Sequence, residues 1–379
     1  FQALKENYHA VVLAYGADAD RSLGIPGEEL EGVHSARSFV EWYNGHPSAV
    51  GCDFGLTRCE TAVVIGNGNV ALDCARMLSS TPEQLVGDTD VAQHAAAKLA
   101  SSSVRQVVLL GRRGVLHAAF TIKELRELSK RAGSTMSLVA PPDAFNDAVL
   151  KEAAKERPRK RLVDLMKSLS TSSVPDPVPP PPAGEPCAIQ VQFQRSPLAF
   201  VGAGDDEQKL GAVRCAITEL EGAPSAGQRA NVIEGSEYDL PCSLVLKSVG
   251  YRSSSMKGVP FDRKRGIVPN EGGRVEGASA LYVTGWLRRG PNGVILTNVN
   301  DAAETASALL HDRQAGLLAT GGKGGDAVRS LLAVQQAPVF GFNEWKRIDD
   351  AEVARGSTAD KVREKIVDIP EMLSVGQTP

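Results

Sequence analysis

The sequence predicts an α/β protein whose parallel strands alternate with helices in two domains. Apolar runs rich in β-branched residues, the kind found in a parallel sheet covered on both faces, occur at 9–17 and 105–114. The stretch 61–80 passes from such a strand through a glycine turn into an amphipathic helix. A chain of 379 residues is also long for a single hydrophobic core, which favours two domains.

Composition excludes several classes of protein. With 42% hydrophobic and 23% charged residues and a net charge of −3, the chain is not a nucleic-acid binder recognised by gross charge, although local basic patches remain possible. No apolar run approaches the roughly 20 residues that cross a bilayer. Six cysteines without a C-x-x-C pair argue against a redox dithiol, a zinc ribbon or an iron–sulfur cluster, and the histidines show no metal-ligand spacing. We therefore expect no metal site.

The remaining segments follow from local patterns. Thr121 is expected to cap a helix at 121–131, with Glu124 at the capping-box position. The other expectations, in chain order, are a helix at 35–45, a helix-containing insertion at 80–103, a surface linker in the proline tract 174–186, an antiparallel meander at 188–246, strands at 244–251 and 281–286, a helix from Gly293 to about 311, and loops with short helices in the last sixty residues.

The first candidate site is a G-x-G-x-x-A turn between a strand and a helix. Gly66 permits the tight turn, Gly68 lets the backbone approach a pyrophosphate, and Ala71 allows close packing of helix on strand. A phosphate would sit on the free amides at the helix N-terminus. The alternative is a structural turn in another α/β fold.

The next strand indicates which nucleotide binds. A site for NAD usually has an acidic residue at that strand's end, whereas this strand ends in Arg112 and Arg113, whose guanidinium groups suit a 2′-phosphate. NADPH is therefore favoured over NADH. The insertion at 80–103 explains why this strand follows Gly66 by about 46 residues instead of the usual ~20. The alternative for the arginine pair is a solvated loop.

A second ligand site is predicted in 281–310. A strand ends at Gly285-Trp286, a Pro-Asn-Gly turn follows, and a helix opens near Val294, so the amides of Gly293, Val294 and Ile295 would be free. Such a terminus stabilises an anion, and a reduced flavin develops negative charge at one edge of its ring. Trp286 would supply a flat wall beside that ring. The alternative is a core tryptophan beside an ordinary helix start.

Several strings, in order and at similar spacing, resemble motifs of the NADPH-dependent adrenodoxin reductase (ferredoxin–NADP reductase) family. They are ARSFVEWYNGHP (36–47), GNGNVALD (66–73), GRRG (111–114), AFTIKELREL (119–128), RPRKRL (157–162), VGY (249–251) and GWLRRGPNGVI (285–295). The resemblance runs the length of the chain. It implies two dinucleotide-binding (Rossmann-like) domains, with an NADP domain inserted into an FAD domain.

The resemblance also implies the activity and its residues. Electrons would pass from NADPH through FAD to a [2Fe–2S] ferredoxin. No catalytic side chain is needed, because the flavin carries the redox chemistry. By similarity, NADP contacts are Arg21, Asn67, Gly68, Asn69, Val70, Arg112, Arg113, Glu124 and Gly293; flavin contacts are Trp286, Gly293, Val294 and Ile295; and Arg126, Arg157 and Arg161 would dock the ferredoxin. For the last group the alternative is a plain charged surface.

The chain departs from the family near its start. It begins with Phe1 and has no second glycine motif before Gly66, so we expect the FAD domain to be N-terminally incomplete. The expected boundaries are 1–16 for the FAD-domain remnant, 17–250 for the NADP domain and 251–379 for the rest of the FAD domain. No targeting segment is present, and a mitochondrial location follows from the family alone.

Two other functions stay open at this point. The first is an NADP-binding fragment without redox activity, since the FAD-binding start is missing. The second is a pyridine-nucleotide oxidoreductase with another acceptor, such as the reductase part of an amidotransferase-type enzyme. Such relatives usually carry cysteines for iron–sulfur clusters, which this chain lacks, and the basic string RPRKRL favours a protein acceptor.

Overall fold

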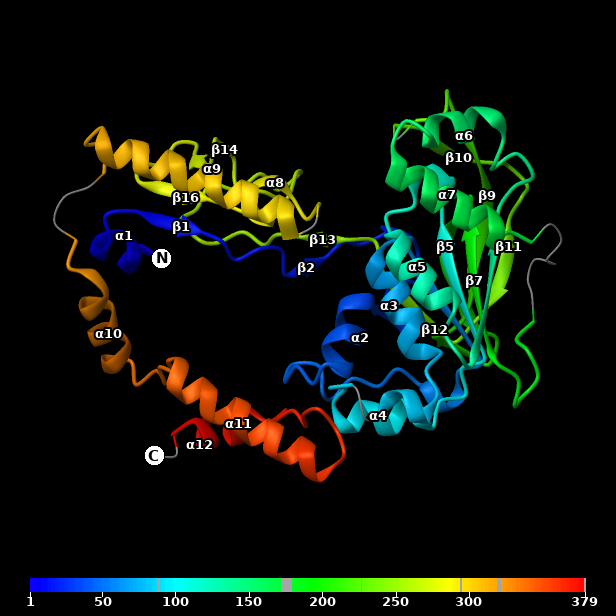
Figure 1. Ribbon diagram of the computed structural model, residues 1–379, viewed down its shortest axis with the longest axis horizontal. Helices are drawn as coiled ribbons and strands as arrows, with labels where there is room; N and C mark the ends of the chain where they lie inside the picture. The colour runs from blue at the N-terminus through cyan, green and yellow to red at the C-terminus, as the bar shows by residue number, and fades with distance from the viewer. Residues whose placement is uncertain (87–88, 172–178, 226, 294, 319–321, 378–379) are drawn as a thin grey trace. The chain divides into compact units, whose positions relative to one another are not determined.

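The computed structural model describes residues 1–86, 89–171, 179–225, 227–293, 295–318 and 322–377, and its chain divides into two compact units (Figure 1). The first unit comprises Phe1–Arg21 and Gly250–Gly341, and the second comprises Ser22–Val249 and Phe342–Pro379. Among the described residues, no helix is long and apolar enough to cross a membrane.

The first unit is built on a small sheet with strand order β1-β16-β15-β14. Strand β1 pairs in parallel with β16, while β2 and β13 form a separate antiparallel ribbon. Its core contains Leu13, Val268, Leu281 and Leu287. The described elements are α1 (Gln2–Asn7), β1 (Val11–Leu13), β2 (Ala19–Asp20), β13 (Tyr251–Arg252), β14 (Asn270–Glu271), β15 (Arg274–Val275), β16 (Leu281–Val283), α8 (Trp286–Arg289), α9 (Ile295–Gln314) and α10 (Gly324–Val334).

The second unit contains a six-stranded parallel sheet of order β3-β12-β4-β5-β7-β6. Its elements up to the last strand of this sheet are β3 (Val33–Ser35), α2 (Ala36–Tyr43), η1 (Leu56–Arg58), β4 (Thr61–Ile65), α3 (Asn69–Leu78), η2 (Pro82–Leu85), α4 (Gln93–Ala100), β5 (Gln106–Gly111), η3 (Val115–His117), α5 (Ile122–Ser129), β6 (Ser134–Val139), α6 (Asp147–Ala153), α7 (Arg157–Leu169), β7 (Cys187–Phe193), β8 (Arg195–Ala203), β9 (Asp206–Glu221), β10 (Arg229–Val232), β11 (Tyr238–Pro241) and β12 (Leu244–Lys247).

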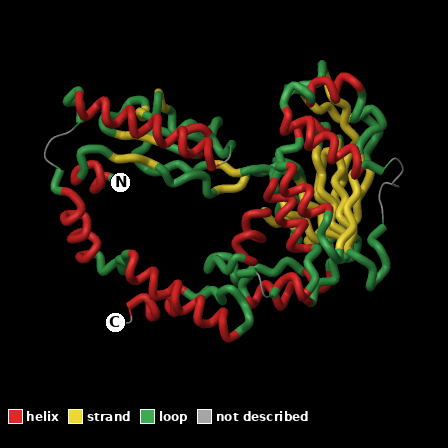
Figure 2. The backbone as a smooth tube through the Cα atoms, in the orientation of Figure 1, coloured by secondary structure: helices red, strands yellow, loops and turns green. Residues whose placement is uncertain are grey.

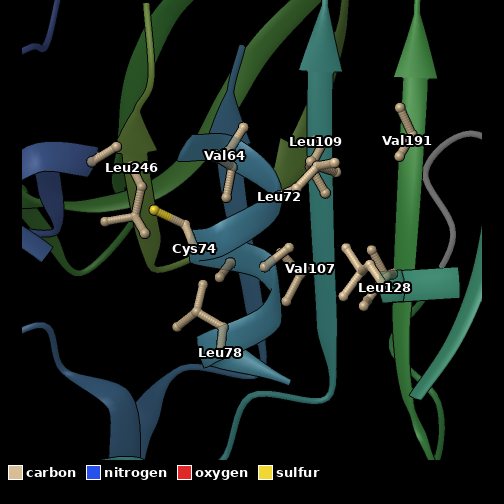
Figure 3. Packing of buried hydrophobic residues seen from close by; sticks show 14 of the residues in the cluster. Val64, Leu72, Cys74, Leu78, Val107, Leu109, Leu128, Val191 and Leu246 are labelled. Carbon is tan, nitrogen blue, oxygen red and sulfur yellow. The ribbon is translucent and has the colours of Figure 1, made fainter. Parts of the chain in front are cut away.

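Helices cover one face of this sheet and antiparallel strands cover the other. Helices α2, α3 and α5 lie on the first face (Figures 1 and 2). Leu72 and Leu78 of α3 pack there against Val64, Val107 and Leu109 of the central strands (Figure 3). On the other face, side chains from β8, β9 and β11 share a core with alternate residues of β4 and β5. The central strands are therefore buried on both sides, as their unbroken apolar sequences predicted.

Most expected elements are present, but the meander at 188–246 was partly wrong. Strand β7 pairs in parallel with β5 and β6 inside the main sheet, and antiparallel pairing is confined to β8–β11. The alternating sequence of β7 misled the prediction because its polar members are buried. Gln190 and Gln192 are almost fully buried, and Nε2 of Gln192 donates a hydrogen bond to Oε1 of Gln190. The described part of the proline tract, 179–186, is loop, and 172–178 lies outside the described residues.

The C-terminal segment also differs from the expectation of short helices. It forms α11 (Phe342–Thr358), a helix of 17 residues, and α12 (Ile369–Gln377). This segment contacts the second unit: Glu364 accepts from the backbone N–H of Gln93 at 3.1 Å, and the Lys361 ammonium donates to the Val91 carbonyl at 2.6 Å. By contacts, residues 342–379 thus group with the second unit, whereas the sequence analysis placed 251–379 in the FAD domain.

Candidate nucleotide and flavin sites

The glycine loop between β4 and α3 has the geometry expected of a phosphate cradle. Gly66 has φ of +133°, and a Cβ added to it would lie 2.1 Å from the Ser248 carbonyl oxygen, so only glycine fits. Gly68 is the N-cap of α3, no side chain caps that helix, and no atom lies within 4 Å of where its Cβ would stand. The amides at the start of α3 therefore have no side-chain cap, and the space at Gly68 leaves room for an anion to approach the backbone.

Asn67 adds a polar group to this loop. Its Nδ2 atom lies against Gly111, 1.8 Å from where a Cβ would stand there, so Gly111 too must be glycine for this packing. Its Oδ1 atom is buried and has no partner among the described residues. An orphaned buried acceptor at a phosphate cradle fits a ligand that donates a hydrogen bond.

Two hydrogen bonds from backbone N–H groups join the segment after the arginine pair to the glycine loop. The N–H of Ala119 donates to the carbonyl of Asn67, and the N–H of Thr121 donates to Oδ1 of Asn69, each at 2.8 Å. Thr121 also caps α5 through a bond from the Glu124 N–H, which confirms the predicted cap. The loop around Asn67, Asn69 and Val70 is thereby fixed to the start of α5.

Two residues that are distant in the sequence, Thr218 of β9 and Gln194 between β7 and β8, hold the backbone of the arginine pair. Thr218 donates its hydroxyl to the Arg112 carbonyl at 2.7 Å, and the N–H of Gln194 donates to the Arg113 carbonyl at 3.2 Å. Gln194 has φ of +57°, and its side-chain amide donates to the Thr218 carbonyl. Both supports were missed in the sequence analysis, because they are distant in the sequence and carry no local signal.

The arginine side chains themselves are exposed and make no ion pair with any described residue. Partial burial, followed by the positive charge of Arg112, lowers the pKa of Arg113 from its ordinary value. Two adjacent guanidinium groups without a counter-charge fit a dianionic phosphate. This supports the interpretation of a 2′-phosphate site.

Glu124 lies in the same unit and already has a partner. Its Oε2 atom is 2.8 Å from Nη2 of Arg76, an arginine of α3 that also reaches Asp73 at 3.0 Å. Arg76 therefore fixes the Glu124 carboxylate relative to α3. Its role was not predicted, although its place one turn beyond Leu72 on an amphipathic helix is visible in the sequence.

The second candidate site lies in the first unit. The indole of Trp286 stacks on Tyr251 with ring centroids 5.8 Å apart, and its Nε1–H is buried without a partner among the residues that the structure covers. Gly285, with φ of +70°, precedes it and has open space at its Cβ position. A flat aromatic wall with an unused donor fits a heteroaromatic ligand such as a flavin.

A buried carboxylate organises this tryptophan loop. Asp301 of α9, only 8% exposed, accepts from the Gly285 N–H and from the Thr284 hydroxyl at 3.1 Å. It also forms an ion pair of 2.8 Å with Arg288 of α8. Gly293 has φ of +91° and packs on Thr297, so a Cβ there would collide with it. Val294 lies outside the described residues, and Ile295 begins α9.

The remaining predicted residues divide between the two units. Arg21 belongs to the first unit, where its Nε donates to the Tyr251 carbonyl at 2.9 Å. The structure thus places Arg21 and Gly293 in a different unit from the glycine loop and the arginine pair. Arg126 lies on α5, and Arg157 and Arg161 lie exposed on α7, which packs against α5.

A metal ion needs several ligating side chains that lie close together. The described part of the chain holds no cluster of three or more metal-ligating side chains. Its cysteines are free, and burial raises the pKa of Cys59 to about 11, so this thiol is protonated at neutral pH.

A glycine loop beside paired arginines in one unit, and a tryptophan with an unpaired indole N–H in the other, form the arrangement expected of a two-domain, dinucleotide-dependent oxidoreductase. Similar proteins specify the class further. The chain is 45% identical over 377 residues to human mitochondrial NADPH:adrenodoxin oxidoreductase, covering 98% of this chain and 74% of that protein. It is 37% identical over 384 residues to the NADPH-ferredoxin reductase FprA of Mycobacterium tuberculosis, covering 79% of it. This chain belongs to the NADPH:adrenodoxin oxidoreductase family.

A solved structure agrees with this assignment. The structure of Mycobacterium tuberculosis FprA in complex with NADPH matches the whole chain with a TM-score of 0.87 and 34% identity, and the match covers 80% of that protein. The Arabidopsis thaliana mitochondrial relative is 38% identical over 386 residues. No protein-family model matches the chain.

Proposed function

We propose that this chain, as an NADPH-dependent flavoprotein reductase, binds the NADPH 2′-phosphate with Arg112 and Arg113 and passes electrons to a [2Fe–2S] ferredoxin. The observation that carries the proposal is the unneutralised arginine pair beside an uncapped helix at a glycine loop. The family's cofactors are FAD and NADP(H) and its acceptors are ferredoxins, which favours a reductase over a nucleotide-binding fragment without redox activity.

The chain's own residues hold and orient the nucleotide. The first amides of α3, from Asn69 and Val70, would bind the pyrophosphate across Gly68, and the orphaned Oδ1 of Asn67 would accept a hydrogen bond from the ligand. Arg21, Glu124 and Gly293 are further NADP contacts in this proposal. Trp286 and the start of α9, with Gly293, Val294 and Ile295, would hold the flavin. Bound FAD supplies the conversion of a two-electron donor into a one-electron donor.

The acceptor would dock on a basic surface made by α5 and α7. Arg126, Arg157 and Arg161 have no carboxylate partner among the described residues, so their charge is available to an acidic protein. Long-range attraction of this kind raises association rates and falls with ionic strength. The mitochondrial location of the eukaryotic relatives supports the same location here, and fractionation of the source cells tests it.

The first test is a visible spectrum of the protein after incubation with FAD and removal of the excess. A retained flavin band that NADPH bleaches under anaerobic conditions is the expected result. If the protein binds NADPH but retains no flavin, the proposed reductase activity is contradicted, and the alternative of a nucleotide-binding protein without redox activity is favoured.

The docking surface is tested by charge reversal. R157E/R161E should slow reduction of a [2Fe–2S] ferredoxin and spare a small dye acceptor. The control is K98E, which reverses the charge of an exposed residue on α4. It should slow neither the reduction of ferredoxin nor that of the dye. Equal slowing of ferredoxin and dye would rule out docking at α7.

A further inference from the structure

The basic string of α7 contains an arginine that does not share the exposed face. Arg157 and Arg161 are four residues apart and therefore lie on one side of the helix, whereas Arg159 is rotated by about 200° from Arg157. Arg159 is half-buried, and its Nη1 donates to the Leu116 carbonyl at 2.5 Å and to the Ala118 carbonyl at 3.4 Å. One helix thus has an outward arginine pair and an inward arginine.

The carbonyls that Arg159 binds belong to a segment, 114–121, that touches both parts of the candidate NADPH site. It starts directly after Arg113, whose own carbonyl is held by Gln194. It then contacts the glycine loop twice, through the bond from Ala119 to Asn67 and the bond from Thr121 to the Asn69 side chain. The position of segment 114–121 therefore fixes the arginine pair and the phosphate cradle relative to each other.

Segment 114–121 has little internal structure with which to hold its shape. Its only helix is the single turn η3, and the side chains of Leu116 and Ala118 are buried, at 7% and 5% exposure. A short turn leaves its last carbonyls without partners of its own. A guanidinium satisfies two such carbonyls at once, through charge-assisted bonds that are stronger than neutral ones.

We propose that Arg159 is a positioning residue that ties the acceptor-docking helix α7 to segment 114–121, and that it thereby couples NADPH binding to acceptor docking. This inference rests on the proposed function, because it uses the NADPH and acceptor sites placed there. A shift of α7 on docking would be transmitted through Arg159 to both nucleotide-binding loops. By linkage, a bound nucleotide would change the affinity for the acceptor by the same factor.

The test is isothermal titration of NADP⁺ into the full chain, for the wild type, R159Q, R159K and K160Q. R159Q should weaken NADP⁺ binding by roughly tenfold, a typical size for the coupling between two sites, because segment 114–121 would no longer hold the arginine pair and the phosphate cradle in one relative position. R159K keeps the charge and one donor, so it should recover most of the affinity. K160Q removes an equal charge from the exposed neighbour, whose partner is Asp164, and should bind like the wild type. Unchanged affinity in R159Q, or equal losses in R159Q and K160Q, would overturn the proposal.

Coupling is measured by repeating the titration with a saturating [2Fe–2S] ferredoxin. The wild type should show a different NADP⁺ affinity with ferredoxin bound, and R159Q should show the same affinity with and without it. If ferredoxin binds to the wild type but leaves its NADP⁺ affinity unchanged, the proposed coupling is overturned. A ferredoxin that does not bind at all would contradict the proposed acceptor, while the titration without ferredoxin still decides the positioning role. Thermal unfolding of each variant shows whether it is folded.

Discussion

The Cα of Gly66 faces the carbonyl oxygen of Ser248 so closely that a Cβ would stand 2.1 Å from it. This contact joins the glycine loop to the end of β12 and leaves no room for a side chain. Gly68, two residues on, has an ordinary φ of −114° and open space at its Cβ position. Gly66 is therefore needed for the packing of the fold, whereas Gly68 leaves room for the ligand.

G66A and G68A should therefore fail in different ways. G66A should lower stability by about 2–4 kcal/mol, because a strained φ and a steric clash add together. G68A should unfold at the wild-type temperature but bind NADP⁺ about tenfold or more weakly, because its methyl group blocks the approach of the pyrophosphate. Thermal unfolding and NADP⁺ titration of both variants measure this. Tight NADP⁺ binding by G68A would place the pyrophosphate elsewhere.

The arginine pair should discriminate between the two nicotinamide nucleotides. R112A/R113A should weaken NADPH by on the order of a hundredfold, because two charge-assisted contacts to the 2′-phosphate are lost. NADH lacks that phosphate and should be nearly unaffected. The dissociation constants of both nucleotides are measured for this variant and for K98A, which controls for the loss of an exposed positive charge outside the site. A parallel loss for NADH would refute the assignment of the pair.

Sequence reasoning found the parts of the site that lie in contiguous strings. The glycine loop, the arginine pair and the Thr121 cap each depend on residues a few positions apart, so their local patterns suffice. Thr218 and Gln194 support the arginine pair from about 80 to 105 positions further along, and only the folded chain brings them there. The roles of Arg76 and Asp301 were not predicted for the same reason, because the sequence around a charged helical residue does not reveal which distant residue it contacts.

The errors in the fold have related causes. Strand β7 alternates apolar and polar residues as a half-exposed strand does, but its glutamines pair inside the sheet. Helix α11 lacks a strong apolar stripe and is supported by charged pairs such as Lys346 with Asp349 and Asp350, so no apolar pattern marked it. The segment after α11 contacts the rest of the second unit through Lys361 and Glu364, and these tertiary contacts leave no local signal in the sequence.

A half-buried ion pair between Glu28 and Lys247 predicts acid sensitivity of the second unit. Burial raises the pKa of Glu28, but hydrogen bonds from Lys247, Ser22 and the Gly24 N–H outweigh it and lower the pKa to about 2. A carboxyl whose folded pKa lies below its ordinary 4.5 stabilises the fold above pH 4.5, and this contribution is lost as the pH falls from 4.5 toward 2. After allowance for solvent screening, the contribution is about 1–2 kcal/mol.

E28Q should therefore be less stable than the wild type at pH 7, and the difference should shrink as the pH falls below 4.5. The exposed neighbour Glu29 offers a matched control, and E29Q should track the wild type at every pH. Unfolding followed by the fluorescence of Trp42, which is buried in this unit, gives the measurement. A constant difference between E28Q and the wild type from pH 7 to pH 3 would contradict the assignment.

The tryptophan loop should depend on Asp301 far more than on Glu304, although both carboxylates pair with Arg288. Asp301 is buried and also holds the Gly285 N–H, whereas the Glu304 side chain is 60% exposed. Breaking a buried pair costs about 3–5 kcal/mol, and an exposed pair is worth about 0–1 kcal/mol. D301N should thus destabilise the first unit and speed amide hydrogen exchange at 284–290, while E304Q should do neither. Because the loop carries Trp286, D301N should also retain less FAD than E304Q. Slow exchange at 284–290 in D301N would mean that the loop holds its shape without Asp301.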